Sequence, residues 1–113
     1  MIAISENSLN MVKEILNKTV PNCEIRAFGS RINGTNRKYS DLDLAIIGEK
    51  KLGISMLGNV KETFMESELP FRVDVLDYNA VSENFRKVID SEYEVVSTAK
   101  VESEITVSHM KAE

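Results

Sequence analysis

Asp41 and Asp43 are the residues whose spacing first suggests chemistry, because they stand at the start of the apolar run LDLAII (residues 42–47), a predicted strand. Successive side chains of a strand point to opposite faces, so both carboxylates lie on one face with Cα atoms about 6.5 Å apart. Two carboxylates at this distance can bind one divalent cation, and oxygen ligands favour Mg²⁺ or Mn²⁺. Taken alone, the pair is more typical of a solvated strand edge.

Ten residues separate Asp41 from the pair Gly29-Ser30, which directly follows a second predicted strand, CEIRAF (residues 23–28). Glycine after a strand lets the backbone turn with positive φ and lets a ligand approach closely. The backbone N–H groups of such a turn, together with the Ser30 hydroxyl, can bind a phosphate. Ordinary turn chemistry explains the pair equally simply when nothing else is considered.

The segment between this turn and the acids is basic, although the chain as a whole is acidic. Residues 26–38 hold four cationic side chains and no acid. Cations there can neutralise phosphate oxygens while a metal on the carboxylates binds the same polyphosphate. For any one of them a solvated loop is the simpler explanation. The four cations are Arg26, Arg31, Arg37 and Lys38.

Asp74 is a third candidate acid, because it stands within the predicted strand FRVDVLDY (residues 71–78), between Val73 and Val75. A carboxylate inside a strand is costly to bury without a partner. If this strand lies beside LDLAII, Asp74 can face the same site as Asp41 and Asp43. Asp77 falls on the opposite face near the strand end and is predicted to be a turn residue. Three acids and a phosphate turn fit two-metal transfer of a nucleotidyl group.

Three helices must position these strands, at residues 5–21, 54–69 and 82–94, giving the order α-β-β-α-β-α. This order predicts an α+β fold with one mixed sheet and helices packed on it. Ser5 or Asn7 can cap the first helix, Pro21 ends it, and Ser82 can cap the third. The residues expected on the inner faces of the helices are Leu9, Val12, Ile15 and Leu16, then Met56, Leu57, Val60, Phe64 and Met65, then Phe85, Val88 and Ile89.

Composition limits the classes of protein that fit. The 113 residues suit one domain, with 42% hydrophobic and 28% charged residues. A net charge of −4 argues against an extended nucleic-acid surface. No apolar run reaches the roughly 20 residues that span a bilayer, and the N-terminus lacks the basic region of a signal peptide. Cys23 is the one cysteine, so no internal disulfide can form, and we expect a cytoplasmic protein. Cys23 itself is predicted to be a small core residue on a strand.

The run AFGSRINGTNRKYSDLDLAI, with Asp74 downstream, resembles the signature of the minimal nucleotidyltransferases of the DNA polymerase beta superfamily. The resemblance covers residues 8 to 96. It implies a polymerase-beta palm in which Asp41, Asp43 and Asp74 are catalytic and hold Mg²⁺ or Mn²⁺. It also implies that ATP is the substrate and that Gly29, Ser30, Arg31 and Lys38 bind it.

The resemblance further implies a partner. Many such small proteins pair with a toxic ribonuclease of the higher eukaryotes and prokaryotes nucleotide-binding (HEPN) class. They act as its antitoxin by transferring AMP to a tyrosine of the toxin, or by binding alone. A non-catalytic antitoxin or a nucleotide-binding regulatory subunit is therefore the alternative function. The acceptor, the base preference and the choice between a homo-oligomer and a hetero-oligomer stay open.

The chain end lies outside the resemblance. We expect a nucleotidyltransferase domain over residues 1–96 and a tail over residues 97–113. The segment VESEITV (residues 101–107) alternates well enough for an edge strand, and a frayed tail fits as well. His109 stands alone there and is expected to be solvent-exposed.

Overall fold

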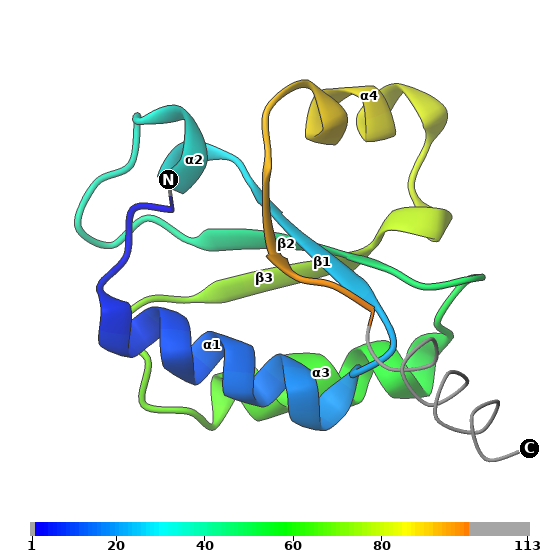
Figure 1. Ribbon diagram of the computed structural model, residues 1–113, viewed down its shortest axis with the longest axis horizontal. Coiled ribbons are helices and arrows are strands. Elements are labelled where there is room, and N and C mark those ends of the chain that lie inside the picture. The colour runs from blue at the N-terminus through cyan, green and yellow to red at the C-terminus, as the bar shows by residue number, and fades with distance from the viewer. Residues whose placement is uncertain (1, 100–113) are drawn as a thin grey trace, which may run out of the picture.

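The computed structural model describes residues 2–99, in which four strands form one mixed sheet in the order β3-β2-β1-β4 (Figure 1). The central strand β1 runs antiparallel to both of its neighbours, whereas β2 and β3 run parallel. A parallel pair needs a crossover connection, and α3 supplies it. The strands are β1 (Glu24–Phe28), β2 (Leu42–Ile47), β3 (Val73–Asp77) and β4 (Glu94–Ser97).

Helix boundaries follow local capping chemistry. The Ser5 hydroxyl accepts a hydrogen bond from the Ser8 N–H at 3.1 Å, and the Ser82 hydroxyl accepts one from the Phe85 N–H at 3.1 Å. Both caps confirm the sequence-based prediction. The helices are α1 (Glu6–Thr19), α2 (Ser30–Asn33), α3 (Ile54–Met65) and α4 (Glu83–Ser91), with a 3₁₀ helix, η1, at Tyr78–Ala80.

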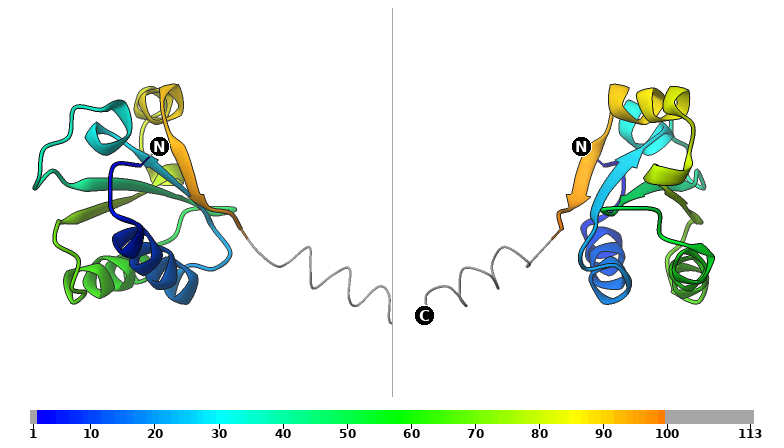
Figure 2. Two further views of the ribbon diagram at one scale, coloured as in Figure 1. Left: turned by 60° about the vertical axis from the view of Figure 1, so that its left-hand side comes forward. Right: turned by 90° about the vertical axis from the view of Figure 1, so that its right-hand side faces the viewer.

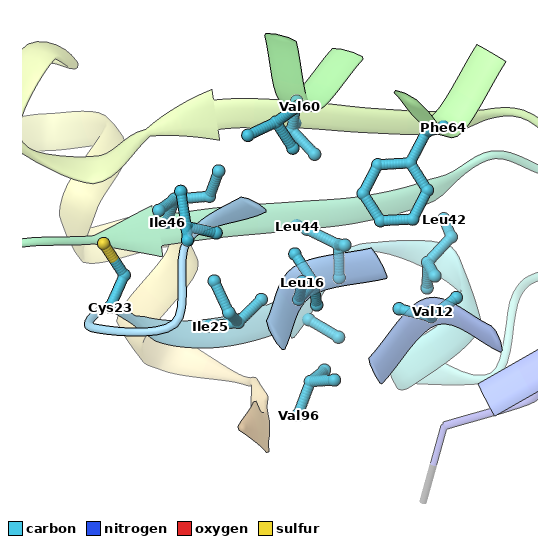
Figure 3. Packing of buried hydrophobic residues seen from close by; sticks show 13 residues of the cluster. Val12, Leu16, Cys23, Ile25, Leu42, Leu44, Ile46, Val60, Phe64 and Val96 are labelled. Atoms are coloured by element: carbon cyan, nitrogen blue, oxygen red, sulfur yellow. The ribbon is translucent and has the colours of Figure 1, made fainter. Parts of the chain in front are cut away.

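The main core lies between the sheet and the pair α1 and α3, which lie side by side on one face (Figure 2). Leu16 of α1 and Val60 of α3 meet Ile25 and Leu44 of the sheet, and all four are fully buried (Figure 3). Each such side chain contributes about 1.5–3 kcal/mol through burial. Alternation along β2 therefore turns Leu42, Leu44 and Ile46 toward the helices and Asp43 toward the other face.

Within residues 2–99, the second face of the sheet is partly covered by α4 and η1. Phe28, Ala45 and Ile89 form a small core there, and the Phe85 ring meets the Phe28 ring edge-on at 6.0 Å. The cover reaches Leu76 but not the start of β3, where Asp74 is exposed, and Asp43 beside it is half-buried. This uncovered region is where the acids of the sequence signature lie.

Several expectations about packing were wrong. The inner-face set included Met56, Met65 and Val88, which are 45%, 82% and 57% exposed, respectively. Met65 is exposed because β3 is the edge strand of the described sheet, and none of the elements in residues 2–99 lies beyond it to cover that side of α3. Phe85 is also 37% exposed, although its ring packs on Phe28.

The boundaries of two elements also differ from prediction. The last helix ends at Ser91 instead of continuing to residue 94, because residues 94–97 pair with β1 as the unpredicted strand β4. Cys23 is buried as expected but precedes β1, and burial raises the pKa of its thiol. The expected edge strand at residues 101–107 and His109 lie outside the described residues. Within residues 2–99, no helix has the length and apolar character required to span a membrane.

Candidate active site

Asp43 and Asp74 face each other across the parallel pair β2 and β3, directly opposite in register. Both carboxylates therefore lie on the same face of the sheet, as the sequence predicted. Burial, then Asp74, then Asp41 raise the pKa of the Asp43 carboxyl to about 6. Asp43 thus lies close enough to both other predicted acids for their negative charges to raise its pKa.

Gly29 joins the turn after β1 to this cluster. Its φ is +88°, a conformation that residues with a Cβ adopt at a cost. A Cβ built at Gly29 would collide with the Asp43 carboxylate. The antiparallel register places Phe28 opposite Asp43, which explains why the next residue touches that carboxylate. Glycine is therefore required here both for the turn and for the space.

Ser30 begins the single-turn helix α2, which starts beside Asp43. The Ile32 and Asn33 N–H groups donate to the Gly29 carbonyl, and Gly34 closes the turn in a left-handed conformation. The N–H groups of Ser30 and Arg31 come before the first intrahelical bond and are free to face a ligand. The arrangement sets anion-binding N–H groups next to the carboxylates, which is favourable when a cation joins the two.

Arg31 does not have the role predicted for its side chain. It is 5% exposed, and its guanidinium donates to the carbonyls of Ala3 at 2.7 Å, Ser40 at 2.9 Å and Lys38 at 3.1 Å. The guanidinium also lies 4.5 Å from the centroid of the Phe71 ring. Its planar fork therefore joins the N-terminal segment to the loop before Asp41, instead of facing a phosphate.

The other predicted cations separate into two groups. Arg26 is not part of the phosphate loop, because its guanidinium is paired with Glu24 and Asp90, each at 2.7 Å. Arg37 and Lys38 lie exposed in the loop between α2 and β2. The Lys38 side chain is exposed, and its Nζ lies 5.4 Å from the centroid of the Tyr39 ring.

Asp77 is a structural residue, which agrees with its prediction as a turn residue. Its carboxylate accepts hydrogen bonds from the Leu52 N–H at 2.8 Å and the Asn79 N–H at 3.0 Å. The side chain is buried on the face of the sheet opposite Asp74. It fixes the start of η1 and the segment before α3, and takes no part in the acid cluster.

Comparison with known proteins identifies the lineage of this arrangement. Residues 10–102 match the family described as polymerase beta, nucleotidyltransferase. The chain belongs to this nucleotidyltransferase family. It is 48% identical over 93 residues, 82% of each chain, to the Haemophilus influenzae protein named "Probable protein adenylyltransferase MntA".

Solved structures confirm the nucleotidyltransferase fold. A toxin–antitoxin crystal structure with AMP-PNP matches 92% of this chain and 90% of its own, with a TM-score of 0.69 and 20% identity. A second match is to a chain in the structure of a tri-AMPylated Shewanella oneidensis HEPN toxin in complex with MNT antitoxin. It covers 96% of this chain and 91% of the matched chain, with a TM-score of 0.65 and 18% identity. At such identities the likeness establishes the shared fold.

The oxygen donors of the nucleotidyltransferase site fit a hard divalent cation. In residues 2–99, no three acidic, histidine or cysteine side chains converge into a ready-made metal cage. Mg²⁺ does not require one, because it keeps several waters and takes further ligands from substrate phosphates. Asp41, Asp43 and Asp74 would hold such a cation, since its charge would offset the repulsion that, after burial, raises the Asp43 pKa.

Sequence reasoning missed the surroundings of Asp74. A pocket of about 320 Å³ lies beside it, between the end of α3 and the segment that leads into β3. No motif marks this pocket, because its walls come from two elements that only the fold brings together. Its lining residues include Lys61, Phe64, Met65, Phe71, Arg72 and Asp74.

Proposed function

We propose that this chain is a Mg²⁺-dependent adenylyltransferase that transfers AMP from ATP to a tyrosine hydroxyl of a HEPN-type toxin and so acts as an antitoxin. The register pairing of Asp43 with Asp74, with Gly29 against the Asp43 carboxylate, is the observation that carries this proposal. It supports the proposal because a turn whose N–H groups could bind phosphate lies next to the acids that such a transfer requires.

The substrate and partner are supported by the relatives. The Haemophilus influenzae relative, at 48% identity, is named for protein adenylylation. The solved relatives include an antitoxin complex with AMP-PNP and one with an AMPylated HEPN toxin. Because ATP is the proposed substrate, we place the protein in the cytoplasm.

The proposed transfer assigns each group a task. The acceptor oxygen bonds to the α-phosphorus while the bond from that phosphorus to the bridging oxygen breaks, and pyrophosphate leaves. Asp74 takes the proton of the acceptor hydroxyl. Gly29, Ser30 and Lys38 bind the triphosphate. When bound at Asp41 and Asp43, Mg²⁺ or Mn²⁺ would neutralise the phosphate oxygens.

The experiment incubates the chain with α-labelled ATP, Mg²⁺ and a HEPN-domain protein from the same organism. Label and the mass of one AMP should appear on the partner, and the double variant D41N/D43N should transfer at least about 10³-fold less. EDTA should abolish transfer by the unaltered chain. If the double variant labels the partner at an undiminished rate, the assignment is wrong.

The same double variant separates catalysis from binding. An antitoxin that acts by transfer loses protection of cells against the toxin when Asp41 and Asp43 become asparagine. If D41N/D43N protects fully while transferring nothing, the function is neutralisation by binding alone. Circular dichroism and co-purification of the variant with the partner serve as controls for folding.

A further inference from the structure

Phe28, Asp43 and Asp74 form one row across the face of the sheet that carries α4. The register pairs Phe28 of β1 with Asp43 of β2, and Asp43 with Asp74 of β3. Residues paired in this way point to the same face of a sheet. Phe28 also directly precedes the turn at Gly29 and Ser30. The row of acids therefore ends at an aromatic ring, beside the turn that binds the triphosphate in the proposed function.

One side of α4 is anchored to a different row of the same face. The Asp90 carboxylate accepts hydrogen bonds from the Arg26 guanidinium and the Tyr78 hydroxyl, each at 2.7 Å. The Arg86 guanidinium donates to the Tyr78 carbonyl at 3.1 Å. Arg26 precedes Phe28 by two residues on β1, so its row is the next one along the sheet from the row of acids. We name the side of α4 that holds Arg86 and Asp90 the anchored flank, and it faces away from the acids.

The other flank of α4 faces the row of acids. Successive residues of a helix are turned by about 100°, so Phe85 and Val88 project on the other side of the buried Ile89 from the anchored flank. The Phe85 ring meets the Phe28 ring edge-on at 6.0 Å, which agrees with this orientation. Phe85 and Val88 are 37% and 57% exposed. Because α4 lies on the same side of the sheet as α2 (Figure 2), this flank forms an apolar wall beside the acids and the turn.

The position of this wall suits the nucleobase of a bound nucleotide. In the proposed transfer the turn holds the triphosphate, and Asp41 and Asp43 hold the cation at the α-phosphate, so the nucleoside extends from the acids across the exposed part of this face. A nucleobase has a flat π surface that stacks on aromatic side chains. The contact with Phe28 restrains the Phe85 ring before a ligand arrives, which reduces the cost of ordering it on binding. The exposed Phe85 ring therefore matches the part of ATP that the turn and the acids leave unbound.

The other exposed aromatic rings within residues 2–99 lie elsewhere. The Arg26 Cζ lies 4.3 Å from the centroid of the Tyr93 ring, so Tyr93 belongs to the side of the anchored flank. Tyr39 adjoins Lys38, which the proposed function assigns to the triphosphate. Phe85 is therefore the exposed ring whose packing places it at the row of acids.

We propose that the nucleobase of the bound nucleotide stacks on the Phe85 ring, with Val88 extending the apolar wall. This nucleobase site rests on the proposed function, which places the triphosphate, and it binds the nucleoside end of the same substrate. Every nucleobase has a π face, so this contact holds the base without itself selecting adenine.

The test compares the binding of two ligands in the presence of Mg²⁺. AMP-PNP carries a nucleobase whereas inorganic tripolyphosphate does not, so a residue that contacts the base affects the first ligand alone. Phe85→Leu keeps an apolar side chain against Phe28 but removes the π face, and Phe85→Tyr keeps both. Tyr93→Leu is the matched control, because Tyr93 is also 37% exposed but lies over Arg26. Isothermal titration calorimetry gives the Kd values, and the KM for the HEPN-domain acceptor is measured alongside.

Phe85→Leu should raise the AMP-PNP Kd at least about fivefold and leave the tripolyphosphate Kd unchanged. Phe85→Tyr and Tyr93→Leu should bind AMP-PNP about as tightly as the unaltered chain. No transfer by the unaltered chain, with AMP-PNP bound in this Phe85-dependent way, would overturn the proposed function and leave the nucleobase site standing.

Three results would overturn the nucleobase site. An unchanged AMP-PNP Kd for Phe85→Leu, with AMP transfer intact, would do so and leave the proposed function standing. Equal weakening of AMP-PNP and tripolyphosphate would show that Phe85 acts on the turn through packing. A raised acceptor KM with an unchanged AMP-PNP Kd would assign this flank of α4 to the protein substrate.

Discussion

The Asp43 carboxylate occupies the space in which a side chain at residue 29 would begin, so only glycine fits at residue 29 beside it. The contact links the turn after β1 to the acid on β2. It makes the position of the phosphate-binding groups depend on the position of the acid. Four predictions follow from this contact and from the groups around it.

Gly29→Ala should lower kcat/KM for AMP transfer by about 10²-fold or more, because the new Cβ displaces the Asp43 carboxylate by an ångström or so. Gly34→Ala is the matched control. Gly34 has a φ of +86°, close to the +88° of Gly29, but nothing lies within 4 Å of a Cβ built there. Gly34→Ala should lose about 1–2 kcal/mol of stability, because Gly34 is in the left-handed helical region. Gly29→Ala should lose about 1–3 kcal/mol, because the ψ of −157° at Gly29 puts it in a region that is essentially restricted to glycine. Equal losses of activity in the two variants would contradict the contact's role.

Asp43→Asn should stabilise the metal-free protein at neutral pH. The pKa of Asp43 is raised to about 6 in the folded state, from 3.8, so the folded state binds this proton more tightly than the unfolded one. Stability is therefore lost as pH rises through this range. After discounting for solvent screening, the variant should gain about 1 kcal/mol at pH 7.5 and little at pH 4.

Urea unfolding of both proteins at the two pH values measures this difference, and comparison with the parent chain cancels the titration of the other acids. Asp77→Asn is a contrasting variant, because the Asp77 carboxylate accepts two backbone hydrogen bonds. It should lose about 1–3 kcal/mol. A destabilised Asp43→Asn variant at pH 7.5 would show that the acid cluster is not under electrostatic strain.

Binding of a divalent cation should weaken as pH falls below about 6, because a proton then competes for Asp43. Mn²⁺ titrated alone, followed by electron paramagnetic resonance, should show a several-fold higher Kd at pH 5 than at pH 7. Asp43→Asn should bind Mn²⁺ more weakly and with less change between these pH values. An unchanged Kd for the unaltered chain would argue against Asp43 as a ligand.

The sequence was sufficient to predict features that depend on neighbouring residues. The alternation around Asp43, the caps at Ser5 and Ser82, and the turn at Gly29 are local, and the structure contains each of them. The strand β4 was missed because its four residues contain little periodic signal. Its existence depends on pairing with β1, far away in the chain.

Long-range topology also explains the errors at α3 and Arg31. Met65 belongs to an apolar pattern that reads as an inner face, but β3 is an edge strand and leaves that side of α3 uncovered. Arg31 stands in a basic loop, and its composition suggests a phosphate ligand. One of its three carbonyl partners, Ala3, lies 28 residues away, and no local pattern could reveal that contact.

Arg31 should act by positioning the active-site loop, and substitution with lysine tests this directly. The guanidinium donates to three backbone carbonyls and packs on Phe71, a geometry that a lysine ammonium cannot reproduce. Arg31→Lys should therefore lower kcat nearly as much as Arg31→Ala, about tenfold or more, and reduce stability by about 1–3 kcal/mol. Arg37→Lys, which keeps a charge at an exposed position of the same loop, should retain both kcat and stability. If Arg31→Lys retained full activity while Arg31→Ala lost affinity for AMP-PNP, the charge of residue 31 would be acting on the phosphates, and the positioning role would be wrong.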